Sequence, residues 1–193
     1  MNFNPFIKNL FTKCIGIVRS PREEWIIIKT EEDSSFRLFA GFLLPLLLLT
    51  FVSSMIGSYS RMNDTTFDMA QVVVSGLKPF LSILSSVVIS ILAVNAMIRT
   101  FGGTPDLNRA AKLVIYSFVP GIIVAIIFGV APSLYILGLF LLYSYYIFFL
   151  GTPVLLDIPT ERQSKFSTLS STTMFITYLI ISFILYSFFG AIK

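Results

Sequence analysis

One short segment of the chain combines the residue types that could bind a phosphate or an acidic group. It runs from Arg99 to Lys112 and contains two adjacent glycines, a proline, an acid and three basic residues. Adjacent glycines permit positive φ and a close backbone approach to a ligand, and basic residues at a membrane surface can form a pocket for a lipid headgroup. The alternative is a turn with a purely structural role. The lipid- or partner-binding residues that we predict are Arg99, Gly102, Gly103, Asp106, Arg109 and Lys112.

Little else in the sequence could support catalysis. The chain has no histidine and a single cysteine, Cys14, so it lacks the commonest general base and cannot form an intrachain disulfide or a thiolate metal cluster. An enzyme acting on lipid would have to use Asp106, Asp157 and Glu161, of which at least two would need to converge. We therefore expect a protein without catalytic residues, metal or cofactor.

The elements that carry these residues follow from the composition, which is 55% hydrophobic and only 12% charged. Apolar windows of about 20 residues predict transmembrane helices. No window alternates polar with apolar residues as a barrel strand must, so the predicted fold is an all-α, polytopic membrane protein. The five predicted spans are Leu38–Ser58, Phe80–Ile98, Leu113–Val130, Leu134–Leu150 and Thr172–Gly190.

Prolines bound or bend several of these spans. Pro132 lies between the third and fourth spans, where it lacks an N–H and disfavours a helical residue before it. We therefore expect a tight hairpin at this point instead of one very long helix. Pro45, Pro79 and Pro120 are expected to kink or bound the first three spans.

The basic residues predict the orientation of the chain, since cytoplasmic loops are enriched in Lys and Arg. Eleven of the fourteen lie before the first span or in the second and fourth connections, and only Arg61, Lys78 and Lys193 lie on the other side. We expect the amino terminus inside and the carboxyl terminus outside, in a bacterial cytoplasmic (inner) membrane. The net charge of +4 then reflects topology and contact with anionic lipids on the cytoplasmic face, and no nucleic acid partner is expected.

Residues 1–35 are predicted to form two amphipathic helices ahead of a membrane domain at residues 36–193. Ser20-Pro21-Arg22-Glu23 predicts a capping box at the start of the second helix, and Trp25 suits headgroup depth. The first helix has apolar residues at helical spacing, namely Phe3, Phe6, Ile7, Leu10, Cys14, Ile15 and Val18. The helices could sense or remodel the membrane, or could simply anchor the chain or pack on the bundle. The acidic run Glu31-Glu32-Asp33 is expected to be a solvated loop or a site for a cation or basic partner.

Small residues at every fourth position predict helix packing within the membrane. In the second span they are Ser82, Ser86 and Ser90, and in the third Gly121, Ala125 and Gly129. These ridges could build the bundle or form the face of a homo-oligomer. Aromatic residues in the fourth span, such as Tyr143 and Phe148, could line a site for lipid or an apolar ligand, or form an aromatic belt.

Several short motifs, taken in order, resemble the bacterial branch of the Yip (Ypt-interacting protein) family. The resemblance covers about Phe11 to Phe189, including the number of spans and the short outer hairpin. The motifs are Pro21 with Trp25, Phe101-Gly102-Gly103, Tyr116-Ser117-Phe118-Val119-Pro120, and the stretch from Leu137-Gly138-Leu139 to Gly151.

The resemblance implies a five-span protein with a cytosolic amino terminus. Eukaryotic members act in vesicle traffic, bind prenylated Rab-type GTPases and associate with one another or with membrane-shaping proteins. This sequence lacks their long cytosolic amino-terminal region and has Arg37 where an acidic residue is usual, so we do not expect a GTPase partner. We predict a non-enzymatic protein that organises membrane or scaffolds other membrane proteins. The alternatives are a lipid or small-molecule transporter or channel, although no span has an ionisable group near its centre, and an enzyme acting on lipid.

Overall fold

The computed structural model describes residues 5–32, 34–62 and 68–191, and every regular element in them is a helix. Five helical segments among the described residues are long and apolar enough to cross a membrane, so the predicted all-α fold and number of spans are confirmed. The spans are Ser35–Tyr59, Met69–Thr100, Leu107–Val130, Ile136–Leu155 and Thr160–Gly190. The elements are α1 (Pro5–Arg19), α2 (Pro21–Thr30), α3 (Ser35–Leu38), η1 (Phe39–Leu43), α4 (Leu44–Tyr59), α5 (Met69–Thr100), α6 (Leu107–Val130), η3 (Tyr135–Phe140), α7 (Leu141–Leu155) and α8 (Thr160–Ala191).

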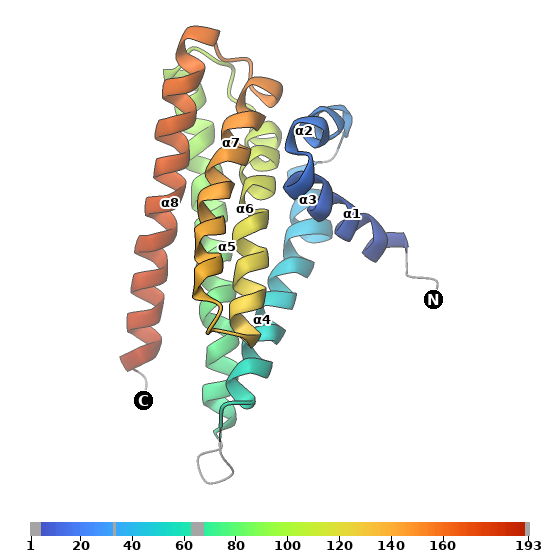
Figure 1. The fold of residues 1–193 in the computed structure, drawn as a ribbon. Coiled ribbons are helices and arrows are strands. Elements are labelled where there is room, and N and C mark those ends of the chain that lie inside the picture. The colour runs from blue at the N-terminus through green and yellow to red at the C-terminus, as the bar shows by residue number, and fades with distance from the viewer. Residues whose placement is uncertain (1–4, 33, 63–67, 192–193) are drawn as a thin grey trace.

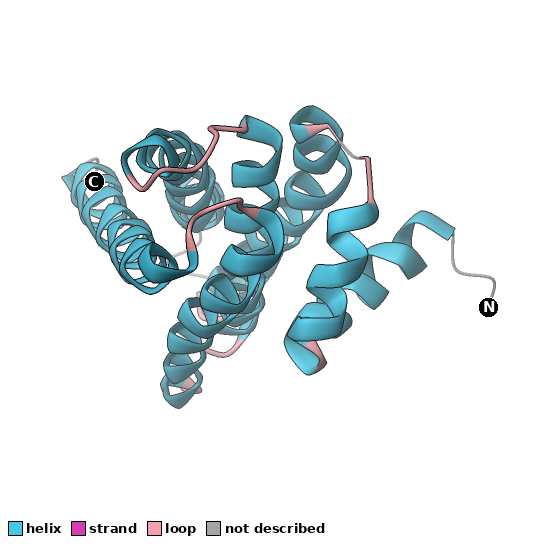
Figure 2. Cartoon of the chain, turned by 90° about the horizontal axis from the view of Figure 1, so that it is seen from above, coloured by secondary structure: helices cyan, strands magenta, loops and turns pink. Residues whose placement is uncertain are grey.

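The spans form an up-and-down bundle in which α6 is the central helix (Figures 1 and 2). Helices α4, α5 and α7 pack on α6, whereas α8 packs on α5 and α7 at the edge. In the most apolar window of each span, 56% of the residues of α6 are buried inside the protein but only 6% of those of α8. Most of the surface of α8 is therefore free to contact lipid. We refer to the two ends of the bundle as the α5–α6 end and the α4–α5 end, after the connections there.

Small residues bring α4 and α6 into backbone contact. A Cβ atom added to Gly57 would lie 1.8 Å from the carbonyl oxygen of Gly129, and one added to Gly129 would meet Ser53 and Ser54. Gly121, in the same predicted ridge, instead lies beside Leu141 of α7. The serine ridge of α5, formed by Ser82, Ser86 and Ser90, is fully buried.

The prolines act in different ways. Pro45 follows the π-helix η1, in which the N–H of Leu44 donates to the carbonyl of Phe39. This wider turn accommodates a residue that cannot donate its own N–H and would crowd the preceding turn. Pro79 and Pro120 lie inside α5 and α6 without ending them. Pro132 lies in the turn after α6, as predicted for a tight hairpin.

Helices α1 and α2 lie against the side of the bundle near its α5–α6 end (Figure 1). The buried face of α1 contains Leu10, Cys14 and Ile17. The predicted face was therefore misplaced in part, because Ile15 is 59% exposed and Ile17 belongs to the core. Phe3 lies outside the described residues, as do the side chains of Phe6 and Ile7. Pro21 begins α2 as predicted, but the capping box is wrong because the Ser20 side chain makes no cap hydrogen bond.

Candidate functional site

Trp25 of α2 forms the centre of the contact between the amino-terminal helices and the bundle. Its side chain is fully buried, and its indole N–H donates to the carbonyl of Ile147 in α7 at 3.1 Å. Its ring meets Tyr116 of α6 edge-on, with 6.1 Å between ring centroids, an arrangement that aromatic pairs favour. Tyr116 also packs on Phe42 of η1, with 4.8 Å between centroids. One aromatic cluster thus joins α2, η1, α6 and α7.

Lys112 is a buried basic residue whose ammonium group binds backbone carbonyls of the protein itself. Its ammonium group donates to the carbonyl of Ile28 at 3.1 Å and to that of Glu31. These carbonyls lie at the end of α2, where helix carbonyls lack intrahelical partners and the helix dipole favours a positive charge. Lys112 therefore fixes the end of α2 on α6.

Three further contacts hold α1 on the rest of the protein. The Lys13 ammonium forms an ion pair with the Glu31 carboxylate at 2.5 Å and donates to the Tyr116 hydroxyl at 3.3 Å. The Tyr143 hydroxyl of α7 donates to the carbonyl of Val18 at 2.9 Å, near the end of α1. Glu31, predicted as part of a solvated acidic run, is thus a partner of Lys13. Asp33 lies outside the described residues.

The two glycines of the predicted site end α5. Gly102 has φ of +86°, the left-handed conformation that glycine adopts without strain. Its N–H donates to the carbonyl of Arg99 at 3.1 Å, and the N–H of Gly103 donates to that of Ile98 at 3.0 Å, which together form a Schellman motif. A Cβ on Gly103 would lie 2.8 Å from Ile98 Cγ2. The pair therefore has a structural role that explains both positions.

The acid of the same segment begins α6. Asp106 accepts hydrogen bonds from the N–H groups of Asn108 and Arg109, which makes it the N-cap. The Arg109 side chain forms ion pairs with Asp106 and with Asp157 in the α7–α8 connection. Of the acids that an enzyme would need, Asp106 and Asp157 therefore meet on one guanidinium group. Glu161 is exposed in the first turn of α8.

The structure divides the six predicted site residues into two groups. Asp106, Arg109 and Lys112 line a cavity of about 420 Å³ at the α5–α6 end, whereas Arg99, Gly102 and Gly103 are not part of its lining. Of the described residues in this lining, three have acidic and three have basic side chains. The other residues of the lining are Lys29, Glu31, Glu32, Ser34, Asn108 and Leu155.

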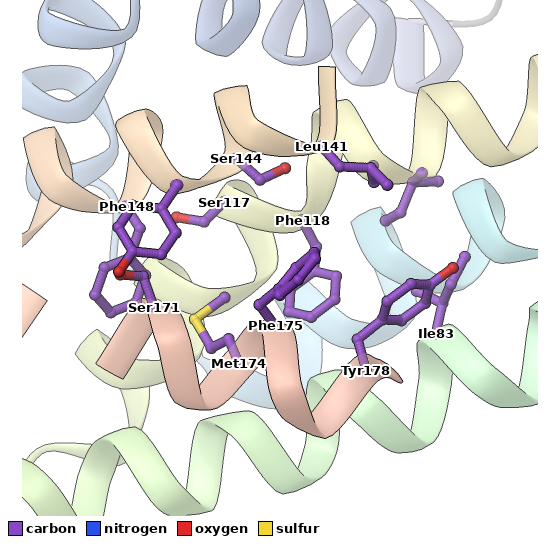
Figure 3. A pocket seen from close by; sticks show the side chains of 13 residues that line it. Ile83, Ser117, Phe118, Leu141, Ser144, Phe148, Ser171, Met174, Phe175 and Tyr178 are labelled. Atoms are coloured by element: carbon purple, nitrogen blue, oxygen red, sulfur yellow. The ribbon is translucent and has the colours of Figure 1, made fainter. Parts of the chain in front are cut away.

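A second set of cavities lies within the bundle. One, of about 60 Å³, lies between α5, α6, α7 and α8 and is mostly apolar (Figure 3). The buried hydroxyls of Ser117 and Ser144, which line it, have no hydrogen-bond partner in the described part of the chain. Another, of about 250 Å³, lies nearer the α4–α5 end and includes Arg61 in its lining. Phe148 and Tyr145 of the aromatic fourth span line the first cavity, whereas Tyr143 holds α1.

The fold and these contacts define a polytopic, all-helical membrane protein with two amino-terminal helices docked on its bundle. A family model described as the Yip1 domain matches residues 15–184, so the chain belongs to the Yip1 domain family. This match confirms the family resemblance. No curated protein and no solved structure is significantly similar to the chain.

Three of the residues that carried the family resemblance, Trp25, Tyr116 and Gly151, meet in space. Trp25 lies between Tyr116 and Gly151, and a Cβ on Gly151 would be 2.5 Å from Trp25 Cε2. Sequence reasoning did not identify this contact, nor the roles of Lys112 and Ile147. Two features of the sequence could have indicated this contact: the single tryptophan, and a glycine near the end of the fourth span. A glycine there permits close packing of a large ring.

Proposed function

We propose that this protein is a non-enzymatic membrane organiser, in which α1 and α2 form a lipid-facing element held rigidly on the five-span bundle. The observation that supports this most directly is the two-sided character of these helices. One side is buried on the bundle through Cys14, Trp25 and Ile28, and the other side is also apolar. The outward apolar side chains, each more than half exposed, are Phe11, Ile15, Ile26 and Ile27.

Basic residues next to these apolar side chains support a position at the membrane surface. Lys8, Arg19, Arg22 and Lys29 are all exposed on α1 and α2. Helices of this composition insert their apolar face by about 5–10 Å into the headgroup region and are attracted to anionic lipid. A pair of helices fixed to a transmembrane bundle at that depth occupies area in one leaflet only, which favours curvature.

The same proposal covers the features that the family match leaves open. We infer that the α5–α6 end faces the cytoplasm of a bacterial cell, that anionic lipids contact it, and that partners are other membrane proteins or further copies of the chain. The transporter or channel alternative stays a prediction. Among the described residues, no charged side chain lines the cavity of about 60 Å³ between α5, α6, α7 and α8.

Reconstitution into vesicles tests the proposal. The full-length protein is placed in vesicles of phosphatidylethanolamine and phosphatidylglycerol, and vesicle diameter is measured by electron microscopy at fixed protein-to-lipid ratio. We expect smaller or tubular vesicles with the wild type than with the variant Phe11→Ser, Ile15→Ser, Ile26→Ser and Ile27→Ser. The matched control replaces the same four residues by Leu and should behave as the wild type. Equal diameters for all three proteins would refute the curvature mechanism.

A further inference from the structure

The two cavities inside the bundle are parts of one cleft. Gly121, Leu141 and Tyr178 line both of them. The cleft therefore runs along the bundle between α5, α6, α7 and α8, and its wider part also reaches the end of α4. Helix α8, which contributes Tyr178 and Tyr186 to the lining, is also the span with the smallest buried share.

The chemical character of the cleft changes along its length. Toward the α5–α6 end its walls are apolar and largely aromatic, formed by Phe118, Phe148 and Phe175 with Ile83 (Figure 3). Toward the α4–α5 end the lining includes polar and basic side chains. These are Ser54, Ser75, Arg61 and Tyr186. A ligand that matches both parts must be amphiphilic.

Two basic residues lie at the polar part of the cleft, Arg61 in its lining and Lys78 beside the lining residue Tyr186. Arg61 lines it and has no ion pair among the described residues. The Lys78 ammonium lies 5.6 Å from the ring centroid of Tyr186, which also lines it. Among the residues that the structure describes, no acidic side chain is part of this lining, and Asp68 at the start of α5 accepts a hydrogen bond from the N–H of Ala70. The end of the cleft is therefore suited to an anion.

We propose that the cleft binds one acyl chain of an anionic phospholipid, with the phosphate near Arg61 and Lys78 and the chain between the aromatic walls. The narrow apolar part, of about 60 Å³, suits a flexible chain better than a rigid ring system. The lipid comes from the leaflet at the α4–α5 end, opposite to the one that contacts α1 and α2. This proposal is independent of the proposed function.

Lipid binding by the full-length protein tests this inference. Delipidated protein in mild detergent is mixed with phosphatidylglycerol or with phosphatidylcholine of identical chains, and bound lipid and thermal stability are measured by native mass spectrometry and a melting assay. We expect phosphatidylglycerol to bind at one copy per chain and to raise Tm by several degrees more than phosphatidylcholine. The variant Arg61→Gln and Lys78→Gln should lose this preference, with at least a tenfold weaker affinity for phosphatidylglycerol.

Matched variants separate the cleft from general charge effects. Arg162→Gln with Lys165→Gln removes two exposed basic residues from the α5–α6 end and should leave the preference unchanged. Gly121→Leu fills the junction of the two cavities and should reduce binding of both lipids; Ala125→Leu, in the wider part, replaces it if that variant fails to fold. Equal binding of the two lipids by the wild type, an unchanged preference in the Arg61 and Lys78 variant, or a second copy of the chain filling the cleft would each overturn the proposal.

Discussion

The indole ring of Trp25 occupies the space that a side chain at position 151 would need. A Cβ on Gly151 would lie 2.5 Å and 2.6 Å from two ring atoms of Trp25 and 2.7 Å from Leu113 Cδ1. Real Cβ atoms do not approach other heavy atoms so closely, and both neighbours are buried core residues. The position of α2 on the bundle thus depends on the absence of a side chain in α7.

Replacing Gly151 by Val should displace Trp25 and release α2 from the bundle. The loss should be comparable to removal of a large buried side chain, about 3–5 kcal/mol. Cys14 is the single cysteine and is buried on α1, so its rate of alkylation by a maleimide measures the release. Gly41→Val is the matched control, because a Cβ at Gly41 meets nothing within 4 Å. Equal alkylation rates in the two variants would contradict this account.

Lys112→Gln should weaken the same contact by removing the charge that the end of α2 needs. We expect a loss of about 1–3 kcal/mol, since the carbonyls of Ile28 and Glu31 both lose a charged donor. Hydrogen exchange at the amides of α2 measures it. Arg99→Gln, at an exposed position, should have no effect on exchange there. Loss of anionic lipid binding with unchanged exchange in the Lys112 variant would instead mean that Lys112 faces a ligand.

Gly102→Val should destabilise the turn at the end of α5, because a β-branched residue at φ of +86° is strained. The cost should be about 1–2 kcal/mol, whereas Gly102→Asn should cost less because Asn tolerates this conformation. Thermal melting in detergent compares the two variants. A phosphate-binding role for Gly102 would be indicated if both variants kept the wild-type Tm but lost lipid binding.

The burial of Cys14 should make the docking of α1 on the bundle depend on pH in the alkaline range. Burial raises the pKa of Cys14 from 9.0 to about 11. Below pH 9 the thiol is protonated in the docked and undocked states alike, so its contribution to the free energy of docking is fully present. Between pH 9 and 11 the undocked thiol loses its proton first, and docking weakens. Cys14→Ser should remove this part of the pH dependence, which hydrogen exchange of α1 between pH 8 and 11 would reveal.

Reporter fusions test the predicted orientation, for which the evidence is the distribution of Lys and Arg. Fusions near residues 2, 108 and 164 should report the cytoplasm, and fusions near residues 63, 133 and 193 the opposite side. Cytoplasmic signals at both Asn63 and Asn108 would be incompatible with a span between them.

The spans could be predicted because the thickness of a bilayer requires about 20 apolar residues each. Four of the five expected windows lie within an observed span, and the fourth, Leu134–Leu150, begins just before the observed span Ile136–Leu155. The buried face of α1 could not be predicted from the sequence. Ile15 and Ile17 are both apolar, but Ile15 is exposed on the protein surface and Ile17 is buried on the bundle. Periodicity alone does not show whether the neighbour of an apolar residue is lipid or protein.

The roles of the site residues depend on contacts that are distant in sequence. Lys112 is of the residue type expected to bind a lipid headgroup, but its partners are carbonyls at the end of α2. Gly102 and Gly103 were expected to permit positive φ, and Gly102 adopts it, but the turn ends a helix. Tyr116 and Gly151 contributed to the family resemblance, yet only the structure shows that Trp25 joins them.

The hydrogen bond from Trp25 to Ile147 also constrains the order of events during synthesis. Chains emerge from the ribosome amino terminus first, so α1 and α2 exist before the segment that accepts them has been translated. They can reach their final position only after the fourth span has entered the membrane. Until then Trp25 and the apolar residues beside it remain at the membrane surface. The amphipathic composition of α1 and α2 suits this position. Two helices that are made before all five spans are therefore among the last elements to reach their final position.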